Sequence, residues 1–344
     1  MMRRAAPAIL GALFAAVITA TAMQDAFVEM TPETHRSVEK GIAWLVENQN
    51  RDGSWGCFKG DAPSVAVTSL ACLALMAGGG TPERGNHAER IRKALAYLLK
   101  TANRRSGMIV ANDGTGLGPL YEHSFGTLFL SQVYGMLSAE SRERDDVREA
   151  LKRATAMISQ TQEENGSWQS NLAITANMWL ALRNANTAGV NVEAISLERI
   201  VKFVDSCAQG EGVYGLAPRG GESGHVTYST AAGLRILYGM GKRESDVAKK
   251  ATEYLLSKTL GDDYGGRLSE WDYCTAFYAT SALLHDEKDS WRKWYPKIRD
   301  FLVKKQNPDG SWTVEYCRSC KAYATALSLV ILQTPKRLLP MFQY

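Results

Sequence analysis

One seven-residue phrase occurs three times in this chain of 344 residues. It reads QNRDGSW at 49–55, QEENGSW at 162–168 and QNPDGSW at 306–312. Each copy contains an Asp-Gly or Asn-Gly pair, which is a turn signal, because glycine accepts positive φ and Asp or Asn bonds its own backbone. A phrase that recurs at long intervals indicates a repeat architecture, and the repeat has to be settled before a fold is assigned.

The repeating unit is larger than the phrase. An amphipathic segment comes first, and in each unit it is followed by a segment that is apolar nearly all round and rich in Ala, Thr and Gly. Two of these second segments, AVTSLACLALMAG at 66–78 and AITANMWLALRNA at 173–185, align without gaps. The amphipathic segments centre on Trp44, Tyr97, Met157, Phe203, Tyr254 and Phe301, which makes six units.

This pairing of segments predicts the fold. An amphipathic helix borders water, whereas a helix that is apolar all round is buried. Six such pairs predict an all-α, (α/α)6 toroid with six outer amphipathic helices around six inner apolar helices. The repeated phrase then has a structural role: its turn ends the outer helix, its Trp packs against the neighbouring unit and its Gln bonds helix-end carbonyls. The residues expected to act in this way are Gln49, Asp52, Gly53, Trp55, Gln162, Gly166, Trp168, Gln306, Asp309, Gly310 and Trp312.

The first residues have the pattern of a secretory signal peptide. Arg3 and Arg4 precede a short apolar run, and Ala20-Thr21-Ala22 forms an A-x-A cleavage site. We expect residues 1–22 to be removed and the protein to be exported to the periplasm or the extracellular space. An uncleaved N-terminal membrane anchor is the alternative.

The rest of the chain is expected to form one domain. Residues 23–35 lead into the toroid of six repeats at 36–334, and 335–344 form a C-terminal tail. The net charge is +4, and basic residues are mixed with acidic ones, which excludes the concentrated basic face of a nucleic-acid-binding protein. No later stretch approaches the length of a transmembrane helix, so no integral membrane domain is expected after signal cleavage.

Export makes disulfides possible, and six cysteines allow fifteen pairings. Cys72 lies inside an apolar run and is expected to be a core thiol. Cys57, Cys274, Cys317 and Cys320 all fall on turns or inner-helix starts, and hence on one side of the ring. We expect at least two of these four to lie within bonding distance, first of all Cys274 beside Cys317 or Cys320.

At this point the chain resembles a known family. The motif Q-x-x-D-G-S-W followed by an Ala/Thr-rich helix is similar to the prenyltransferase/squalene-oxidase repeat of squalene–hopene cyclases and protein prenyltransferase β subunits, over about 36–334. The run WRKWYPKIRDFLVKKQNPDGSW at 291–312 also looks like small exported bacterial single-toroid members. The resemblance implies an α/α toroid and, in its enzymes, chemistry on isoprenoids.

The cyclase chemistry that the resemblance implies requires an acidic D-x-D-D segment, and the chain has none. Asp145 and Asp146 are adjacent carboxylates, but they open an outer amphipathic helix and are expected to face water. Cyclisation by the family's acid is therefore not expected.

The prenyltransferase chemistry requires zinc held by D-x-C and a later His. The segment EWDYC places Asp272 and Cys274 where that family has its D-x-C, but Lys321 and Ala322 stand near the position of the His. Zinc needs three or four ligands. We therefore expect no cofactor, with zinc at Asp272 and Cys274 as the lesser alternative.

The starts of the inner helices are expected to face one common opening. Aromatic side chains with a few polar groups there would suit an apolar or amphipathic ligand. His123 is a candidate general acid or base, and Asp272 is a second catalytic candidate. In the alternative, these groups cap helices and bond one another. The expected mouth residues are Tyr121, Glu122, His123, His225, Tyr228, Trp271, Tyr273, Glu315 and Tyr316.

Two functions remain open from the sequence. The first is a non-catalytic or degenerate binding module whose ring cavity holds a hydrophobic small molecule or a protein partner. The second is an enzyme acting on an isoprenoid or lipid substrate, resembling a cyclase or a prenyltransferase. The missing D-x-D-D and the missing zinc His favour the first.

Overall fold

The computed structural model describes residues 29–111, 118–192, 194–218, 225–262, 265–286, 290–315 and 320–343. Within these ranges the chain forms twelve α-helices and two short 3₁₀ helices, and its only β-pairing is three isolated bridges. The outer helices are α2 (Pro32–Glu47), α4 (Ala88–Thr101), α6 (Arg144–Gln160), α8 (Ala194–Ser206), α10 (Asp246–Ser257) and α12 (Ser290–Lys305). The inner helices are α3 (Val65–Ala77), α5 (Pro119–Met136), α7 (Leu172–Thr187), α9 (Val226–Gly239), α11 (Glu270–Leu283) and α13 (Lys321–Gln333), and the 3₁₀ helices are η2 (Thr334–Lys336) and η3 (Pro340–Phe342).

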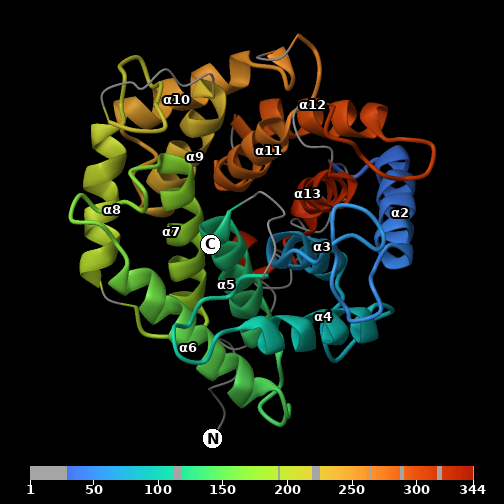
Figure 1. Ribbon diagram of the computed structural model, residues 1–344. Coiled ribbons are helices and arrows are strands. Elements are labelled where there is room, and N and C mark those ends of the chain that lie inside the picture. The colour runs from blue at the N-terminus through green and yellow to red at the C-terminus, as the bar shows by residue number, and fades with distance from the viewer. Residues whose placement is uncertain are drawn as a thin grey trace, which may run out of the picture.

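The six inner helices form a closed ring. Helix α3 packs on α5, and the contacts continue through α7, α9, α11 and α13 back to α3. Figure 1 looks along the ring, with the inner helices around the centre and the outer helices at the periphery. The α/α toroid predicted from the repeats is confirmed.

The burial of the two layers follows their sequence patterns. All thirteen residues of α3 are buried, as expected for a helix that is apolar all round. Helix α4 buries only Ile91, Ala94, Leu95 and Leu98, a stripe at helical spacing. The remaining face of α4 carries charged residues, so each outer helix covers the inner ring with one side and meets water with the other.

The tryptophans of the repeated phrase are buried staples, as predicted. Trp55, Trp168 and Trp312 are at most 1% exposed. Each indole N–H donates to the backbone oxygen of the residue ten positions earlier, at 2.8 to 3.0 Å. Each tryptophan is thereby fixed between the end of its outer helix and the start of the next inner helix, where it fills the apolar core.

The glycines of the phrase dock each turn on the next unit. Gly53, Gly166 and Gly310 have φ near +90°, and a Cβ at these positions would lie 2.1 to 2.6 Å from a backbone oxygen of α4, α8 and α2 respectively. Only glycine permits both the conformation and the approach. Because the third copy docks on α2, the last unit of the chain is joined to the first.

The other residues of the phrase hold the turn itself. The side-chain amides of Gln49, Gln162 and Gln306 each donate to the glycine carbonyl four residues later, at 2.9 Å. The carboxylates of Asp52 and Asp309 accept the backbone N–H of the serine two positions on, at 3.0 Å. These contacts hold the turn, but the glutamines bond its glycine carbonyls instead of the helix-end carbonyls that were expected.

A disulfide crosses the seam where the two ends of the ring meet. Cys57 bonds Cys320, with their Cα atoms 4.4 Å apart. The prediction that two of the four cysteines lie together is confirmed, but the expected partner was wrong. Cys274 is a buried thiol whose Sγ lies 2.6 Å from Tyr323 Oη, and Cys317 lies outside the described residues. Cys72 is the core thiol that its apolar surroundings predicted.

The C-terminal segment is part of the domain rather than a loose tail. It runs across the carboxyl ends of the inner helices, and Figure 1 shows the C-terminus near the middle of the ring. Met341 and Phe342 are buried, and the Met341 N–H donates to Gln132 Oε1 of α5 at 2.8 Å. Just before this segment, Gln333 Nε2 donates to Ala74 O of α3 at 2.9 Å, which ties the seam at this end also.

The N-terminal part of the chain enters the fold shortly before α2. Thr31 caps this helix by accepting the Thr34 N–H at 3.2 Å. The predicted signal peptide at 1–22 lies outside the described residues. Among the helices that the structure describes, none has the combination of length and apolar character that crossing a bilayer requires.

Candidate functional site

Two carboxylates at the amino end of the ring cap helices. Glu122 of α5 reaches the start of α3, where it accepts the Ser64 hydroxyl and the Val65 N–H, the latter at 2.6 Å. Asp272 of α11 accepts the Ser269 N–H at 2.8 Å and the Gly261 N–H at 2.7 Å. Helix N-termini present unpaired N–H groups and favour negative charge, so both acids are held by the fold, and the catalytic role considered for Asp272 has no support in its contacts.

His123 is also held by the backbone on both sides of its ring. Its Nδ1 accepts the Ile109 N–H at 3.0 Å, so Nε2 carries the proton and faces Ala154 O at 3.3 Å. Burial lowers the pKa of His123 to about 4. A neutral imidazole with both nitrogens bonded inside the core has no position left for a substrate proton, which corrects the expectation of a general acid or base.

Two further predicted mouth residues tie α11 to the loop that precedes α13. The Tyr273 hydroxyl donates to Thr313 O at 3.0 Å. Glu315 Oε2 accepts the Leu268 N–H at 2.8 Å. Both side chains hold neighbouring segments together, and Tyr316 lies outside the described residues.

The remaining mouth residues form an aromatic cluster that fills the amino end of the ring. The hydroxyls of Tyr121 and Tyr228 are hydrogen-bonded. The Tyr228 ring centroid lies 5.0 Å from that of Trp271 and 5.9 Å from that of Tyr278, and His225 packs on Trp271 at 4.8 Å. Such distances are those of packed aromatic pairs. These side chains therefore contact one another across the ring.

The two key residues of the D-x-C segment lie in different environments. Asp272 caps its helix, whereas Cys274 lies in the core beside Tyr323. Burial raises the pKa of the Cys274 thiol to about 12, and a protonated thiol is a poor ligand because metals bind the thiolate. The described residues contain no group of three or more His, Cys, Asp or Glu side chains placed to hold a metal ion.

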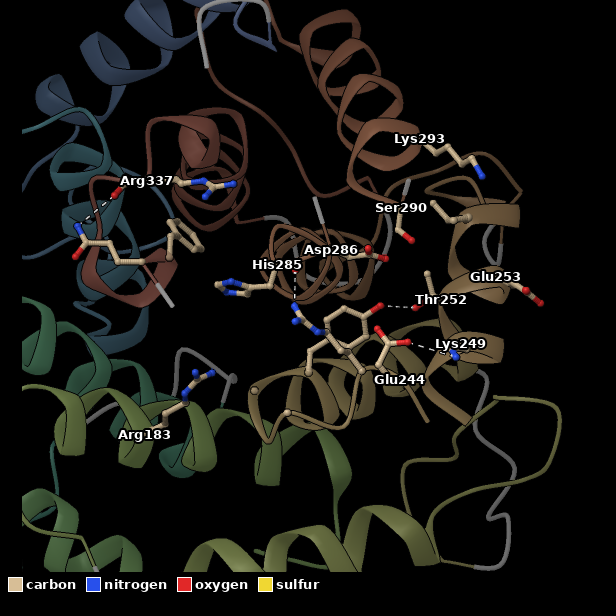
Figure 2. A pocket seen from close by; sticks show the side chains of 17 residues that line it. Arg183, Glu244, Lys249, Thr252, Glu253, His285, Asp286, Ser290, Lys293 and Arg337 are labelled. Carbon is tan, nitrogen blue, oxygen red and sulfur yellow. Dashed lines mark hydrogen bonds and ion pairs between the residues drawn. The ribbon is translucent and has the colours of Figure 1, made fainter. Parts of the chain in front are cut away.

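A large cavity lies at the opposite end of the ring, beside the carboxyl ends of α7, α9 and α11. Its volume is 1040 Å³. Figure 2 shows its polar side chains, which come from inner helices, from α10 and α12, and from the C-terminal segment. The cationic residues on its wall are Arg183, Arg243, Lys249, Lys293 and Arg337, the carboxylates are Glu244, Glu253 and Asp286, and His285 lies among them.

The charges within the cavity are unevenly divided. Glu244 pairs with Lys249 at 3.4 Å on the side of α10. His285 lies on the other side, and in Figure 2 its ring is between the side chains of Arg337 and Arg183. Burial and the nearby arginines, Arg235 foremost, lower the pKa of His285 to about 3. The imidazole is therefore neutral, and four arginines lie near it.

Sequence reasoning missed this cavity, although a signal was present. Arg183 and Arg235 stand inside otherwise apolar inner segments, LALRNA and GLRIL. Arg235 is only 1% exposed, and a buried charge is rare unless something compensates it. An arginine inside an apolar inner segment could have indicated a charged site at the carboxyl end of the ring.

The fold and these two ends define an all-helical α/α toroid with a packed aromatic amino end and a cationic cavity at the carboxyl end. Residues 13–338 match the model of the prenyltransferase alpha-alpha toroid domain. The chain belongs to this family. No curated protein sequence matches the chain.

Solved structures of similar fold include a terpene cyclase and a glycosidase. A variant of the type II terpene cyclase MstE from Scytonema, in complex with geranylgeranyl dihydroxybenzoate, is 15% identical with a TM-score of 0.61, over 89% of this chain and 98% of that one. The same cyclase in its apo form is 14% identical with a TM-score of 0.57, over 90% and 100%. A glycosidase variant is 12% identical with a TM-score of 0.63, over 90% and 98%. At these identities the likeness shows the fold alone.

Proposed function

We propose that this protein is an exported, non-catalytic binding module that holds a small amphipathic ligand in the cavity at the carboxyl end of its ring. The proposal rests on the contrast between the two ends of the ring. At the amino end, Glu122, His123 and Asp272 are bonded to backbone groups. These three side chains are thus engaged by the fold rather than presented to a substrate. At the carboxyl end, the cavity lies among charged side chains, most of them cationic.

The cavity suits a ligand with both an apolar and a polar part. Tyr238, Leu256 and Phe342 contribute apolar surface to a wall that is mostly polar and charged, so the wall can contact both parts of such a ligand. A toroid of the same fold, MstE, binds geranylgeranyl dihydroxybenzoate, a molecule with an isoprenoid chain and an aromatic acid. That precedent supports an amphipathic ligand.

Export is supported by the predicted signal peptide and by the disulfide. The bond between Cys57 and Cys320 is of a kind that persists in oxidising compartments and is rare in reducing ones. We place the protein in the periplasm or outside the cell.

Calorimetric titration with dodecanoate tests the proposal. We expect saturable binding of one molecule, and Phe342→Ala should weaken it roughly tenfold through lost apolar contact, about 1.4 kcal/mol. Val247→Ala is the matched control, because Val247 is an exposed residue of α10 that is not part of the cavity wall. Absence of binding to the unaltered protein would contradict the proposal.

The enzymatic alternative is tested on the same preparation. Purified protein is incubated with a linear polyprenyl substrate, and the extract is analysed by mass spectrometry. A cyclised or transferred product would overturn the non-catalytic assignment.

A further inference from the structure

Helix α12 is the most basic of the outer helices. It contains a single carboxylate, Asp300, and six basic side chains: Arg292, Lys293, Lys297, Arg299, Lys304 and Lys305. In the sequence, acidic residues stand just before the helix, at Asp286, Glu287 and Asp289. Charges are therefore segregated in this part of the chain, acidic before α12 and basic along it. The mixing of signs noted for the chain as a whole does not extend to this helix.

The neighbouring outer helices do not cancel the charge of α12. Figure 1 shows α12 at the periphery of the ring, between α10 and α2. Helix α10 has two lysines and two carboxylates, and α2 has one arginine, one lysine and three carboxylates. Within α2, Arg36 pairs with Glu33 at 2.6 Å. The surface formed by the three helices is therefore positive, with its charge concentrated on α12.

Three lysines of α12 have no carboxylate partner among the described residues. Arg299 pairs with Asp300 at 2.8 Å, and Lys305 pairs with Glu315 at 3.4 Å. The three that remain, at positions i, i+4 and i+11 of the helix, share one stripe of its surface and are exposed. The basic stripe consists of Lys293, Lys297 and Lys304.

An apolar slot adjoins the basic stripe, between α12 and the end of α10. Its volume is 80 Å³, and its walls include Leu260, Trp294, Ile298 and Phe301. Lys297 also lines the slot, and its Nζ donates to the carbonyl oxygen at the end of α10 at 2.6 Å. That bond fixes the lysine in place without neutralising it. Apolar side chains beside a row of lysines are typical of surfaces that lie at the headgroup level of a membrane.

The N-terminal part of the described chain is held on α12 as well. Trp291 Nε1 donates to Glu29 Oε1 at 2.6 Å, and Arg299 Nη1 donates to Glu29 O at 2.9 Å. Glu29 follows the predicted cleavage site after Ala22 by only seven residues, and seven residues of chain reach at most roughly 25 Å. Where the apolar run at 5–17 enters a bilayer, before cleavage or as an anchor, α12 is therefore close to that bilayer.

We propose that the basic stripe binds the surface of a bilayer that contains anionic phospholipids. Each basic residue near an anionic membrane surface strengthens partitioning about fivefold, which corresponds to about 1 kcal/mol. Lys293 also lies on the wall of the large cavity, so binding in this orientation brings the edge of that cavity to the lipid. The inference goes beyond the function proposed above and does not require the cavity to be occupied.

Sedimentation of the purified protein with vesicles tests the stripe. Vesicles of phosphatidylglycerol and phosphatidylcholine in equal parts are compared with vesicles of phosphatidylcholine alone. We expect saturable binding to the first and at least tenfold weaker binding to the second. Raising the salt from about 0.1 to about 1 M shortens the Debye length from about 10 to about 3 Å, so binding should fall steeply. Equal binding to both kinds of vesicle would overturn the proposal.

Two double variants locate the binding surface on α12. Lys297→Gln with Lys304→Gln removes two charges and should weaken vesicle binding about twentyfold. Lys297→Arg with Lys304→Arg keeps both charges and should bind as the unaltered protein does. The control is Arg92→Gln with Lys100→Gln, which removes two exposed charges from α4, two positions away around the ring. Loss of binding in this control equal to that in the glutamine variant of α12 would overturn the assignment to the stripe.

Amine acetylation of the unaltered protein gives a second measurement that needs no variant. Vesicles should protect Lys304 from acetylation fivefold or more, as measured by mass spectrometry, and should leave Lys100 of α4 unchanged. Equal protection of the two lysines would contradict binding through α12.

The stripe and the cavity fail separately. Absence of sedimentation with phosphatidylglycerol vesicles rejects the stripe, while the dodecanoate titration still reports on the cavity. Absence of dodecanoate binding rejects the cavity and leaves the stripe. Binding to polyglutamate without any sedimentation would assign α12 to an acidic protein partner and overturn the membrane proposal.

Discussion

At the amino ends of the inner helices, acidic side chains meet backbone N–H groups, whereas at the carboxyl ends arginines gather around His285. In the first arrangement, Glu122 and Asp272 are buried acceptors, and tyrosines and Trp271 pack against one another. The second surrounds a cavity of 1040 Å³. Both ends obey the helix dipole, which favours acids at N-termini and cations at C-termini.

The two ends of the ring use the helix dipole in different ways. At the amino end, Glu122 and Asp272 are engaged by backbone N–H groups. At the carboxyl end, cationic side chains and carboxylates line a cavity among the helix ends.

The largest effect is expected from the staple at the seam. Trp312 is fully buried and its indole donates to Leu302 O at 2.8 Å. Trp312→Ala should lower the free energy of unfolding by about 3–5 kcal/mol, measured by denaturant titration. Trp312→Phe keeps most of the packing and should lose about 1–2 kcal/mol, the value of the hydrogen bond. A loss below about 1 kcal/mol in Trp312→Ala would show that the staple is dispensable.

An intermediate effect is expected from His123 as the pH falls. Its folded pKa of about 4 lies below the ordinary value of 6.5, so the unfolded state takes up the proton first. Stability should therefore be constant above about pH 7, fall between pH 6.5 and 4, and level off below, with a total loss of about 3 kcal/mol. His285, also lowered, acts in the same direction.

The contribution of His123 is isolated by comparison with His123→Gln, in which it cannot titrate while His285 still does. Denaturant titrations of both proteins are run at each pH. If the two proteins show the same pH dependence, the buried imidazole of His123 is not the cause.

The smallest effect on stability is expected at the cationic end. Arg337→Gln removes one of several like charges and should change the free energy of unfolding by no more than about 0.5 kcal/mol. Arg337→Gly suits the positive φ and should be neutral or slightly stabilising, by up to about 1 kcal/mol. A thermal or denaturant melt checks both. A loss comparable with that of Trp312→Ala would remove the contrast between the two ends.

The fold could be predicted because its rules are local and repeated. The period of apolar residues separates inner from outer helices, and the phrase at 306–312 fixes turn and staple together. Even units without the full phrase keep its contact: a Cβ on Gly107 or Gly212 would lie 2.3 Å from the backbone of the next outer helix. Such patterns can be recognised in the sequence without knowing which side chains face them across the ring.

The site could not be predicted in the same way, because it depends on side chains far apart in the sequence. Whether Tyr121 and Tyr228 line an opening or fill it is decided by the volumes facing them from other helices. The partner of Cys320 depended on the position of one loop of the first unit. Arg337 reaches the cavity only because the C-terminal segment turns back across the ring. The expectation of a C-terminal tail at 335–344 did not include this path.

The bond between Cys57 and Cys320 has a consequence for how the molecule comes apart. It joins residues 263 positions apart. In an open repeat array the terminal repeats have a neighbour on one side only, and disorder can start there and spread inward. With first and last units covalently joined, the chain is a circle of nearest neighbours without terminal repeats. Reduction of this one bond would leave the seam held by noncovalent contacts alone, and unfolding could then begin there.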